Sequence, residues 1–275
     1  MRRLPLLLLL ALLLPLAPQA LRAVRHAPEP GPAQSVGSRH AAAAASAAAA
    51  APLCTPEPAG DPGAPWILIG HFSTYYPGSS PDRNYNLALA AKKLCGRVVP
   101  AGGVFSFNGS LGPASRENGF HLGHVFIGDR IVPGYGGGVC QVASTIYNAA
   151  RRAGLPIVER HQHGLTVPYL APGEDSTISY GSLDLQIRND TGEPLRLVMS
   201  AQGPGITAEF FGSRQPPDVS YRHKTLSTRP FPTIRRPDPK LARGQEAVDM
   251  PGQGGVTVHT WLDRRWPDGR VQTLD

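Results

Sequence analysis

Cysteine is scarce in this sequence, with three residues among 275. So low a count excludes a small domain held together by a network of disulfides. Cys54 lies in a stretch that is poor in large apolar side chains, which leaves Cys95 and Cys140 in the part that can fold. A disulfide between these two cysteines is an alternative in an oxidising compartment, and it would remove Cys140 as a reactive thiol.

Large apolar residues are almost absent from residues 24–65, which are rich in proline, alanine and glycine. Such a segment cannot bury a core, so we expect a disordered tether there. Before it, two arginines precede an apolar run over residues 4–16, which is too short for a stable membrane span. Residues 1–23 are therefore predicted to be a secretory signal peptide, and the protein to be secreted or held in the cell envelope. An uncleaved N-terminus, the alternative, would keep the protein close to the membrane.

Acidic residues are outnumbered, and the formal net charge is +7 with a pI of about 9.6. In an exported protein this balance favours an anionic envelope polymer or a membrane surface as partner, rather than nucleic acid. Plain solubility explains the same charge equally well.

The remaining chain predicts an α+β fold, with short helices packed on antiparallel strands in one mixed domain over residues 66–215. Ser80-Pro81 has the form of a helix start, and Gly96 that of its end. Alternating apolar residues predict strands, and Gly128-Asp129 predicts a hairpin turn. The predicted strands are 66–72, 125–127, 131–133, 183–187, 195–199 and 206–210. A turn is predicted to join strands 183–187 and 195–199 directly. Residues 216–275 are predicted to be a proline-rich connector followed by a β-hairpin.

Three consecutive glycines, Gly136 to Gly138, come just before Cys140 and Gln141. A loop without Cβ atoms can bring its N–H groups close to another molecule. The apolar spacing after it predicts a helix that ends at Gly154, so Cys140 lies at or just before a helix N-terminus. This position favours a thiolate, and the glycine amides beside it would stabilise an oxyanion. The other interpretation is a small buried cysteine behind a tight turn.

Two histidines follow the predicted helix in a segment that can be extended. In a strand, Glu159, His161 and His163 would share one face and Arg160 the other. Asp175 follows in a turn.

The order of these motifs closely resembles the VanW family over about residues 72–212. The resemblance is carried by Thr74-Tyr75-Tyr76, Pro100–Asn108, Gly136–Gln141, Tyr147-Asn148-Ala149, Glu159–His163 and Asp175. It implies an exported, cell-wall-associated protein. It also implies L,D-transpeptidase-like chemistry, with the cysteine of the glycine-rich motif as nucleophile.

Acyl transfer by a thiol needs a nucleophile, a base, a group that orients the base, and oxyanion donors. We assign Cys140 as nucleophile and His163 as base, with His161 in reserve. Asp175 is assigned as the orienting acid, ahead of Glu159 or Asp184. The alternatives are a purely structural histidine at position 163 and a turn-capping aspartate at position 175.

Five residues complete the predicted site. The backbone of Gly137 and Gly138 and the side chain of Gln141 are expected to serve as oxyanion donors, while Arg116 and Arg160 are expected to bind a substrate carboxylate or to be surface charges. We predict no metal and no cofactor, because the spacing of Cys140 and the histidines fits no zinc template. Peptidoglycan or another envelope polymer is the expected partner. A non-catalytic wall-binding module and, less favoured, a zinc-dependent hydrolase are the alternatives to an acyl-transfer enzyme.

Overall fold

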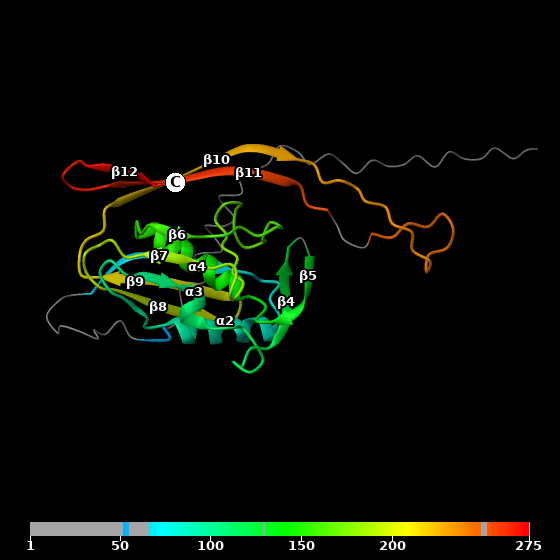
Figure 1. The fold of residues 1–275 in the computed structure, drawn as a ribbon, viewed down its shortest axis with the longest axis horizontal. Coiled ribbons are helices and arrows are strands. Elements are labelled where there is room, and N and C mark those ends of the chain that lie inside the picture. Colours follow the sequence, from blue (N-terminus) through cyan, green and yellow to red (C-terminus); the bar gives the residue numbers. More distant parts are fainter. Residues whose placement is uncertain (1–51, 55–65, 129, 249–251, 275) are drawn as a thin grey trace, which may run out of the picture. The chain divides into compact units, whose positions relative to one another are not determined.

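The computed structural model describes residues 52–54, 66–128, 130–248 and 252–274 (Figure 1). The predicted signal peptide and most of the predicted tether lie outside these residues. Within the described ranges, no helix combines the length and apolar character that a membrane crossing needs. The fold there is mixed, with short helices on antiparallel strands, so the predicted α+β class is confirmed.

A four-stranded antiparallel sheet carries the core, in the order β1-β9-β8-β2. Its strands are β1 (Ile67–Tyr75), β9 (Gly205–Gly212), β8 (Leu195–Gln202) and β2 (Val98–Val99). Helices α2 (Pro81–Leu94) and α4 (Val139–Arg152) pack against it, α4 on β1 and β9 and α2 on β8. Alternate side chains of β8 and β9, such as Leu197, Met199 and Phe210, are buried beneath these helices.

Helix α2 begins as the sequence predicts. The Ser80 hydroxyl accepts a hydrogen bond from the Arg83 N–H (3.3 Å), and Pro81 occupies the first helical position, where its missing N–H costs nothing. Leu87, Ala91 and Leu94 form the buried face. A cap of this kind stabilises a helix by about 1 kcal/mol, and burial of the apolar face fixes which side meets the core.

The remaining strands form smaller sheets beside the core. Strands β3 (Val104–Ser106), β7 (Gln186–Arg188) and β6 (Ile157–Glu159) form a three-stranded sheet, and helix α3 (Phe107–Leu111) follows β3. The predicted hairpin at Gly128 is present as β4 (Leu122–Ile127) and β5 (Arg130–Tyr135). The predicted turn from β7 directly back into β8 is wrong, because β8 pairs with β9 and β2 and therefore belongs to the main sheet.

The C-terminal part holds more strand than the sequence predicted. The expected hairpin is present as β11 (Gly255–Arg265) and β12 (Val271–Leu274), which turn over residues 266–270. A third strand, β10 (Asp218–Arg229), pairs with β11 and lies in the segment expected to be a loosely packed connector. Its backbone groups find partners along β11, and this outweighs the prolines that flank it.

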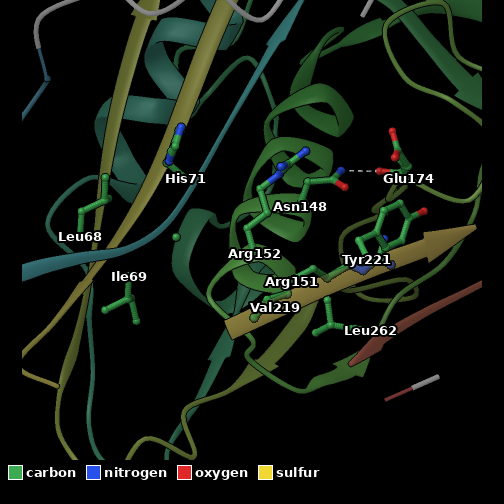
Figure 2. Close-up of a pocket in the computed structure, with 11 residues that line it drawn as sticks. Leu68, Ile69, His71, Asn148, Arg151, Arg152, Glu174, Val219, Tyr221 and Leu262 are labelled. Atoms are coloured by element: carbon green, nitrogen blue, oxygen red, sulfur yellow. Dashed lines mark hydrogen bonds between the residues drawn. The ribbon is translucent and has the colours of Figure 1, made fainter. Parts of the chain in front are cut away.

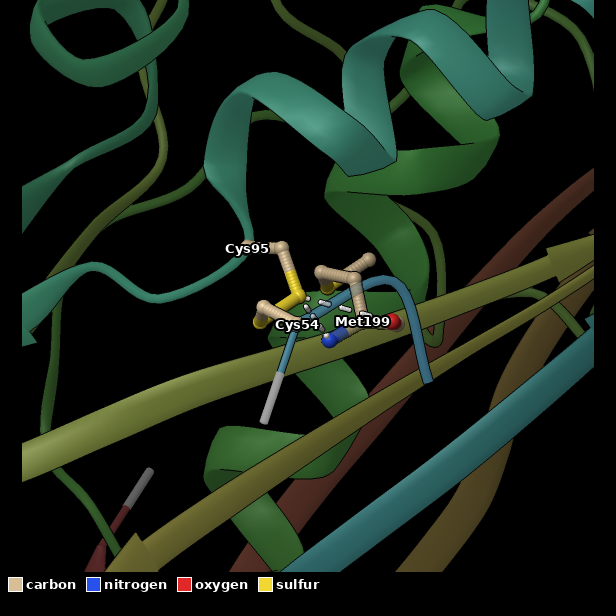
Figure 3. The surroundings of a disulfide bond; sticks show 3 residues. All are labelled: Cys54, Cys95 and Met199. Carbon is tan, nitrogen blue, oxygen red and sulfur yellow. Dashed lines mark hydrogen bonds between the residues drawn. A yellow bond between two sulfur atoms is a disulfide. The ribbon is translucent and has the colours of Figure 1, made fainter. Parts of the chain in front are cut away.

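Cys54 is joined to Cys95 by a disulfide (Figure 3). The predicted alternative of a Cys95–Cys140 bridge is therefore wrong, and Cys140 is a free thiol. The Leu53 N–H donates to the Met199 carbonyl (2.7 Å), and the Met199 N–H points at the Cys95 sulfur (3.1 Å). The three residues 52–54 are thus held against β8, inside a segment whose sequence predicts a tether.

Candidate active site

The glycine loop places Cys140 as the second residue of α4. Gly138 is the N-cap residue and has φ of 105°, a conformation open to glycine but strained for other residues. A Cβ on Gly137 would lie 2.7 Å from the His124 carbonyl oxygen. The glycines are therefore required by close packing within the protein, and this packing holds the helix start in place.

The Cys140 thiol lies next to polar groups of the segment around residue 177. The side chain is half-buried, with the Thr177 hydroxyl 3.6 Å and the Ile178 carbonyl 3.8 Å from its sulfur. Burial alone would raise the pKa of Cys140, but the hydrogen bond and positive charge of His163 outweigh it and hold that pKa below its usual range. A thiol in this setting is ionised more readily than a free cysteine.

His163 is held by Asp175 through two hydrogen bonds. The His163 backbone N–H and its ring Nδ1 each lie 2.7 Å from Asp175 Oδ2. The imidazole is 1% exposed, and the ring of Phe126 meets it edge-on with centroids 5.1 Å apart. With Nδ1 bonded to the carboxylate, Nε2 is the ring nitrogen left to interact with Cys140.

The proton affinity of His163 follows from these contacts. Burial would lower its pKa, but the hydrogen bonds to Asp175 and Cys140 raise it to about 9. The same contacts act on Asp175 in the opposite sense: burial would raise its pKa, and the hydrogen bonds from His163 hold it below its usual range. These shifts favour a thiolate paired with an imidazolium, beside the Asp175 carboxylate, over a neutral thiol beside a neutral imidazole.

Arg160 completes the support of Asp175. Its Nη2 donates to Asp175 Oδ1 (2.8 Å) and its Nε to the Asp175 carbonyl (2.7 Å). The predicted strand face is therefore wrong, because β6 ends at Glu159 and beyond it Arg160 and His163 both turn toward the same carboxylate. Arg160 is engaged in this ion pair, and its role in binding a substrate carboxylate stays a prediction.

The other predicted site residues lie elsewhere. His161 pairs with Glu159 (2.9 Å), and Asp184 accepts from Ser106 and the Asn108 N–H. The Gln141 side chain is fully buried, and its amide donates to Thr74 (3.0 Å) and Pro204 (3.3 Å) instead of facing the thiol. Arg116 lies exposed in the loop before β4. Gly137 and Gly138 adjoin Cys140 as predicted, and their role as oxyanion donors stays a prediction.

Two polar residues of α4 fix the segment containing Asp175: Ser144, which the sequence analysis did not single out, and Asn148, which it named only within a family motif. The Ser144 hydroxyl accepts from the Ser176 N–H (2.8 Å) and donates to the Cys140 carbonyl (2.7 Å). Asn148 donates to the Glu174 carbonyl (2.6 Å). They follow Cys140 by four and eight residues, so one stripe of the helix carries the thiol and both anchors. Polar residues at that spacing in an otherwise apolar helix were the available signal.

A cavity of about 430 Å³ lies at the opposite end of α4 (Figure 2). Its wall includes Arg151, Arg152 and Tyr221, and Glu174 meets Asn148 there. The Arg151 guanidinium lies over the Tyr221 ring, 4.0 Å from its centroid. Arg151 is buried and Arg152 is exposed, with Glu174 close enough to offset part of the Arg152 charge. This cavity does not include Cys140.

No cluster of three or more His, Cys, Asp or Glu side chains in the described ranges is arranged to hold a metal ion. The carboxylate of Asp175 is occupied by the imidazole and backbone of His163 and by the guanidinium of Arg160. What the arrangement can do chemically is present a thiolate next to a proton donor at the start of a helix.

Comparison with known proteins points to one family. The family described as "VanW like protein" matches residues 82–211. An uncharacterized protein, YoaR, of Bacillus subtilis is 35% identical over 145 residues, 53% of this chain and 48% of that protein. The vancomycin B-type resistance protein VanW of Enterococcus faecalis is 28% identical over 141 residues, 49% of this chain and 51% of that protein.

The chain therefore spans about half the length of each of these relatives. No solved structure matches it. The matched region contains α2, the glycine loop, α4 and the segment through Asp175, which are the elements that build the site. The resemblance expected from the motifs is thereby confirmed, and residues 82–211 of this chain are a domain of the VanW family.

Proposed function

We propose that this protein is an exported cell-wall enzyme that transfers acyl groups of peptidoglycan stem peptides through Cys140. One observation carries the proposal: the free thiol at the start of α4 interacts with His163, whose other ring nitrogen is held by Asp175. A thiol, a base and an orienting carboxylate in this order are the parts that cysteine acyl transfer requires.

The first half of the reaction forms a thioester. The Cys140 thiolate attacks the carbonyl carbon of a peptide amide, and the negative charge moves to the carbonyl oxygen. The amide N–H groups at the start of α4 are the donors nearest to that oxygen. The oxyanion collapses, the carbon–nitrogen bond breaks, and the leaving amine takes the proton from Nε2 of His163.

The second half releases the acyl group. An amine of a neighbouring stem peptide attacks the thioester carbon while Nε2 of His163 accepts its proton. The carbon–sulfur bond then breaks, the thiolate returns, and a new amide cross-links the two peptides. Water in place of the amine would give a carboxylic acid, which trims the stem peptide. Asp175 keeps Nδ1 protonated throughout, so that Nε2 is the nitrogen that exchanges the proton.

Envelope localisation is part of the proposal. The basic and apolar N-terminus supports export, and the net charge of +7 suits an anionic wall polymer. The name of the Enterococcus relative links that protein to vancomycin resistance, which supports a cell-wall role for this domain.

Intact mass spectrometry after incubation with muropeptides tests the proposal. Wild-type protein should gain the mass of one acyl group and form cross-linked or trimmed product, and Cys140→Ala should do neither. His163→Ala should lose product as well, since the proton relay is gone, while His161→Ala serves as the matched control because His161 pairs with Glu159 instead. If Cys140→Ala binds wall fragments and keeps full biological activity, the protein is a binding module and the proposal fails.

A further inference from the structure

Arg83 is a cation beside the candidate nucleophile that the proposed mechanism does not use. It lies in the first turn of α2, and a Cβ on Gly138 would be 3.0 Å from its Cγ. Its alkyl chain therefore covers the glycine loop just before Cys140. Burial lowers the pKa of the Arg83 guanidinium and the negative charge of a Cys140 thiolate opposes this shift, in keeping with the packing next to the glycine loop.

The rings of two tyrosines lie next to the Arg83 guanidinium. Its Cζ lies 4.8 Å from the ring centroid of Tyr76 and 6.0 Å from that of Tyr169. Tyr169 is buried, and burial together with the negative charge of Cys140 raises its pKa, so its phenol stays neutral at physiological pH. The rings attract the cation through their faces but supply no negative charge to pair with it.

Arg83 forms no ion pair with a carboxylate in the described part of the chain. Its one side-chain hydrogen bond there joins Nη1 to the Ser79 hydroxyl (3.2 Å), which leaves most of its five N–H donors unused. Arg83 is half-buried, so its guanidinium has lost part of its water, and this burial lowers its pKa. A partly desolvated cation with spare donors is a site for an anion.

We propose that Arg83 is the carboxylate subsite of this centre, binding a free carboxylate of the donor peptide close to the attacked carbonyl. This inference rests on the proposed function and names the chemistry of its substrate. The placement follows from the packing of Arg83 on Gly138, two residues before Cys140. A planar guanidinium suits a carboxylate because it can donate two parallel hydrogen bonds.

Two sources can supply that carboxylate. One is the C-terminal α-carboxylate of a donor whose scissile amide precedes its last residue. The other is a side-chain carboxylate on the residue whose carbonyl is attacked. Both give the same contact with Arg83, and peptides amidated at one position or the other distinguish them.

The test measures binding in the Cys140→Ala background, so it does not depend on turnover. Calorimetric Kd values are compared for a stem peptide with both carboxylates free and for its two singly amidated forms. We expect one amidation to weaken binding about ten- to hundredfold, the usual worth of a charge-assisted hydrogen-bond pair. Adding Arg83→Gln should weaken the free acid by the same factor and abolish the difference between acid and amide.

Two further variants protect the interpretation. Arg188→Gln removes an exposed arginine on β7 and should leave all three Kd values unchanged. Arg83→Lys keeps the charge and should retain part of the acid preference, and it replaces Arg83→Gln if that protein does not fold. The inference is overturned if neither amidation changes Kd, or if Arg83→Gln still discriminates acid from amide. Failure of acylation by wild-type protein would overturn the proposed function alone.

Discussion

Replacing Asp175 by asparagine should uncouple the thiol from the imidazole. The substitution keeps the size of the side chain but removes the negative charge that faces Nδ1 of His163 at 2.7 Å. Burial then remains as a force that lowers the pKa of His163, while the contact that raised it most is lost. We expect the pKa of His163 to fall well below 9, and the pKa of Cys140 to rise as its imidazolium partner disappears.

The size of the effect can be worked out at one pH. With a pKa of about 9, His163 is about 90% protonated at pH 8, whereas a histidine with the ordinary pKa of 6.5 is about 3% protonated there. The imidazolium available to pair with the thiolate thus falls about thirtyfold as the pKa approaches its ordinary value. Product formation should fall less than in Cys140→Ala, because nucleophile and base both remain.

The assay combines two titrations. Side-chain NMR of labelled histidine, assigned with His163→Ala, follows the imidazole. Alkylation by iodoacetamide against pH follows the thiolate, whose midpoint should lie below about 8.5 in the wild type and rise in Asp175→Asn. Asp218→Asn, which changes an exposed aspartate at the start of β10, is the matched control. If Asp175→Asn titrates like the wild type at both groups, the carboxylate does not set their pKa values and the reasoning is refuted.

Three further predictions concern stability. Reduction of the disulfide, or Cys54→Ser, should lower the free energy of unfolding by up to about 4 kcal/mol in denaturant titrations, given the separation of 41 residues that it closes; unchanged stability would contradict this. Gly138→Ala should lower the melting temperature of the protein more than Gly102→Ala does. Both glycines have positive φ, but only at Gly138 would the new Cβ meet Arg83. Equal decreases in melting temperature would exclude packing against Arg83 as the cause. The melting temperature should decrease at pH values below about 4, because Asp175, whose pKa is lowered in the folded state, then gains a proton and its stabilisation is lost. It should decrease again as the pH rises through about 9, because His163, whose pKa is raised in the folded state, then loses its proton. A melting temperature that stays constant across both limits would refute the linkage.

Local patterns were enough to predict the two long helices, α2 and α4, and most strands, but not the short helix α3. Ser80-Pro81, the glycines and the alternating apolar residues act through contacts a few residues apart, which a sequence displays directly. The third C-terminal strand was missed because pairing between residues 218–229 and 255–265 depends on a distant partner, and prolines around it predict a connector. The bond between Cys54 and Cys95 was missed for a similar reason, since the sequence around Cys54 contains nothing that could build a core.

The prediction of the site likewise succeeded for residue types and failed for contacts that depend on the three-dimensional structure. The sequence was enough to single out Cys140 and Asp175, because their residue types suit a nucleophile and an orienting acid. The alternation expected of a strand placed Arg160 on the wrong face, because it assumed regular pleating beyond Glu159. Side-chain hydrogen bonds to Asp175 replace that pleating from Arg160 to His163. Arg83 left only a weak signal, a basic residue in a first helical turn, where the helix dipole favours acids.

The charges of the site explain why Arg83 matters for substrate choice. In the favoured state the Cys140 thiolate is balanced by the His163 imidazolium, and the Asp175 carboxylate by the Arg160 guanidinium. Moving the proton from His163 to Cys140 leaves this sum unchanged, because both groups of that pair become neutral together. Arg83 is then the one positive charge left without a counter-charge among these five groups. An incoming carboxylate neutralises it without disturbing either pair, whereas an uncharged peptide would leave a partly desolvated cation facing the scissile amide. The centre should therefore select acidic donors even where the rest of the peptide makes identical contacts.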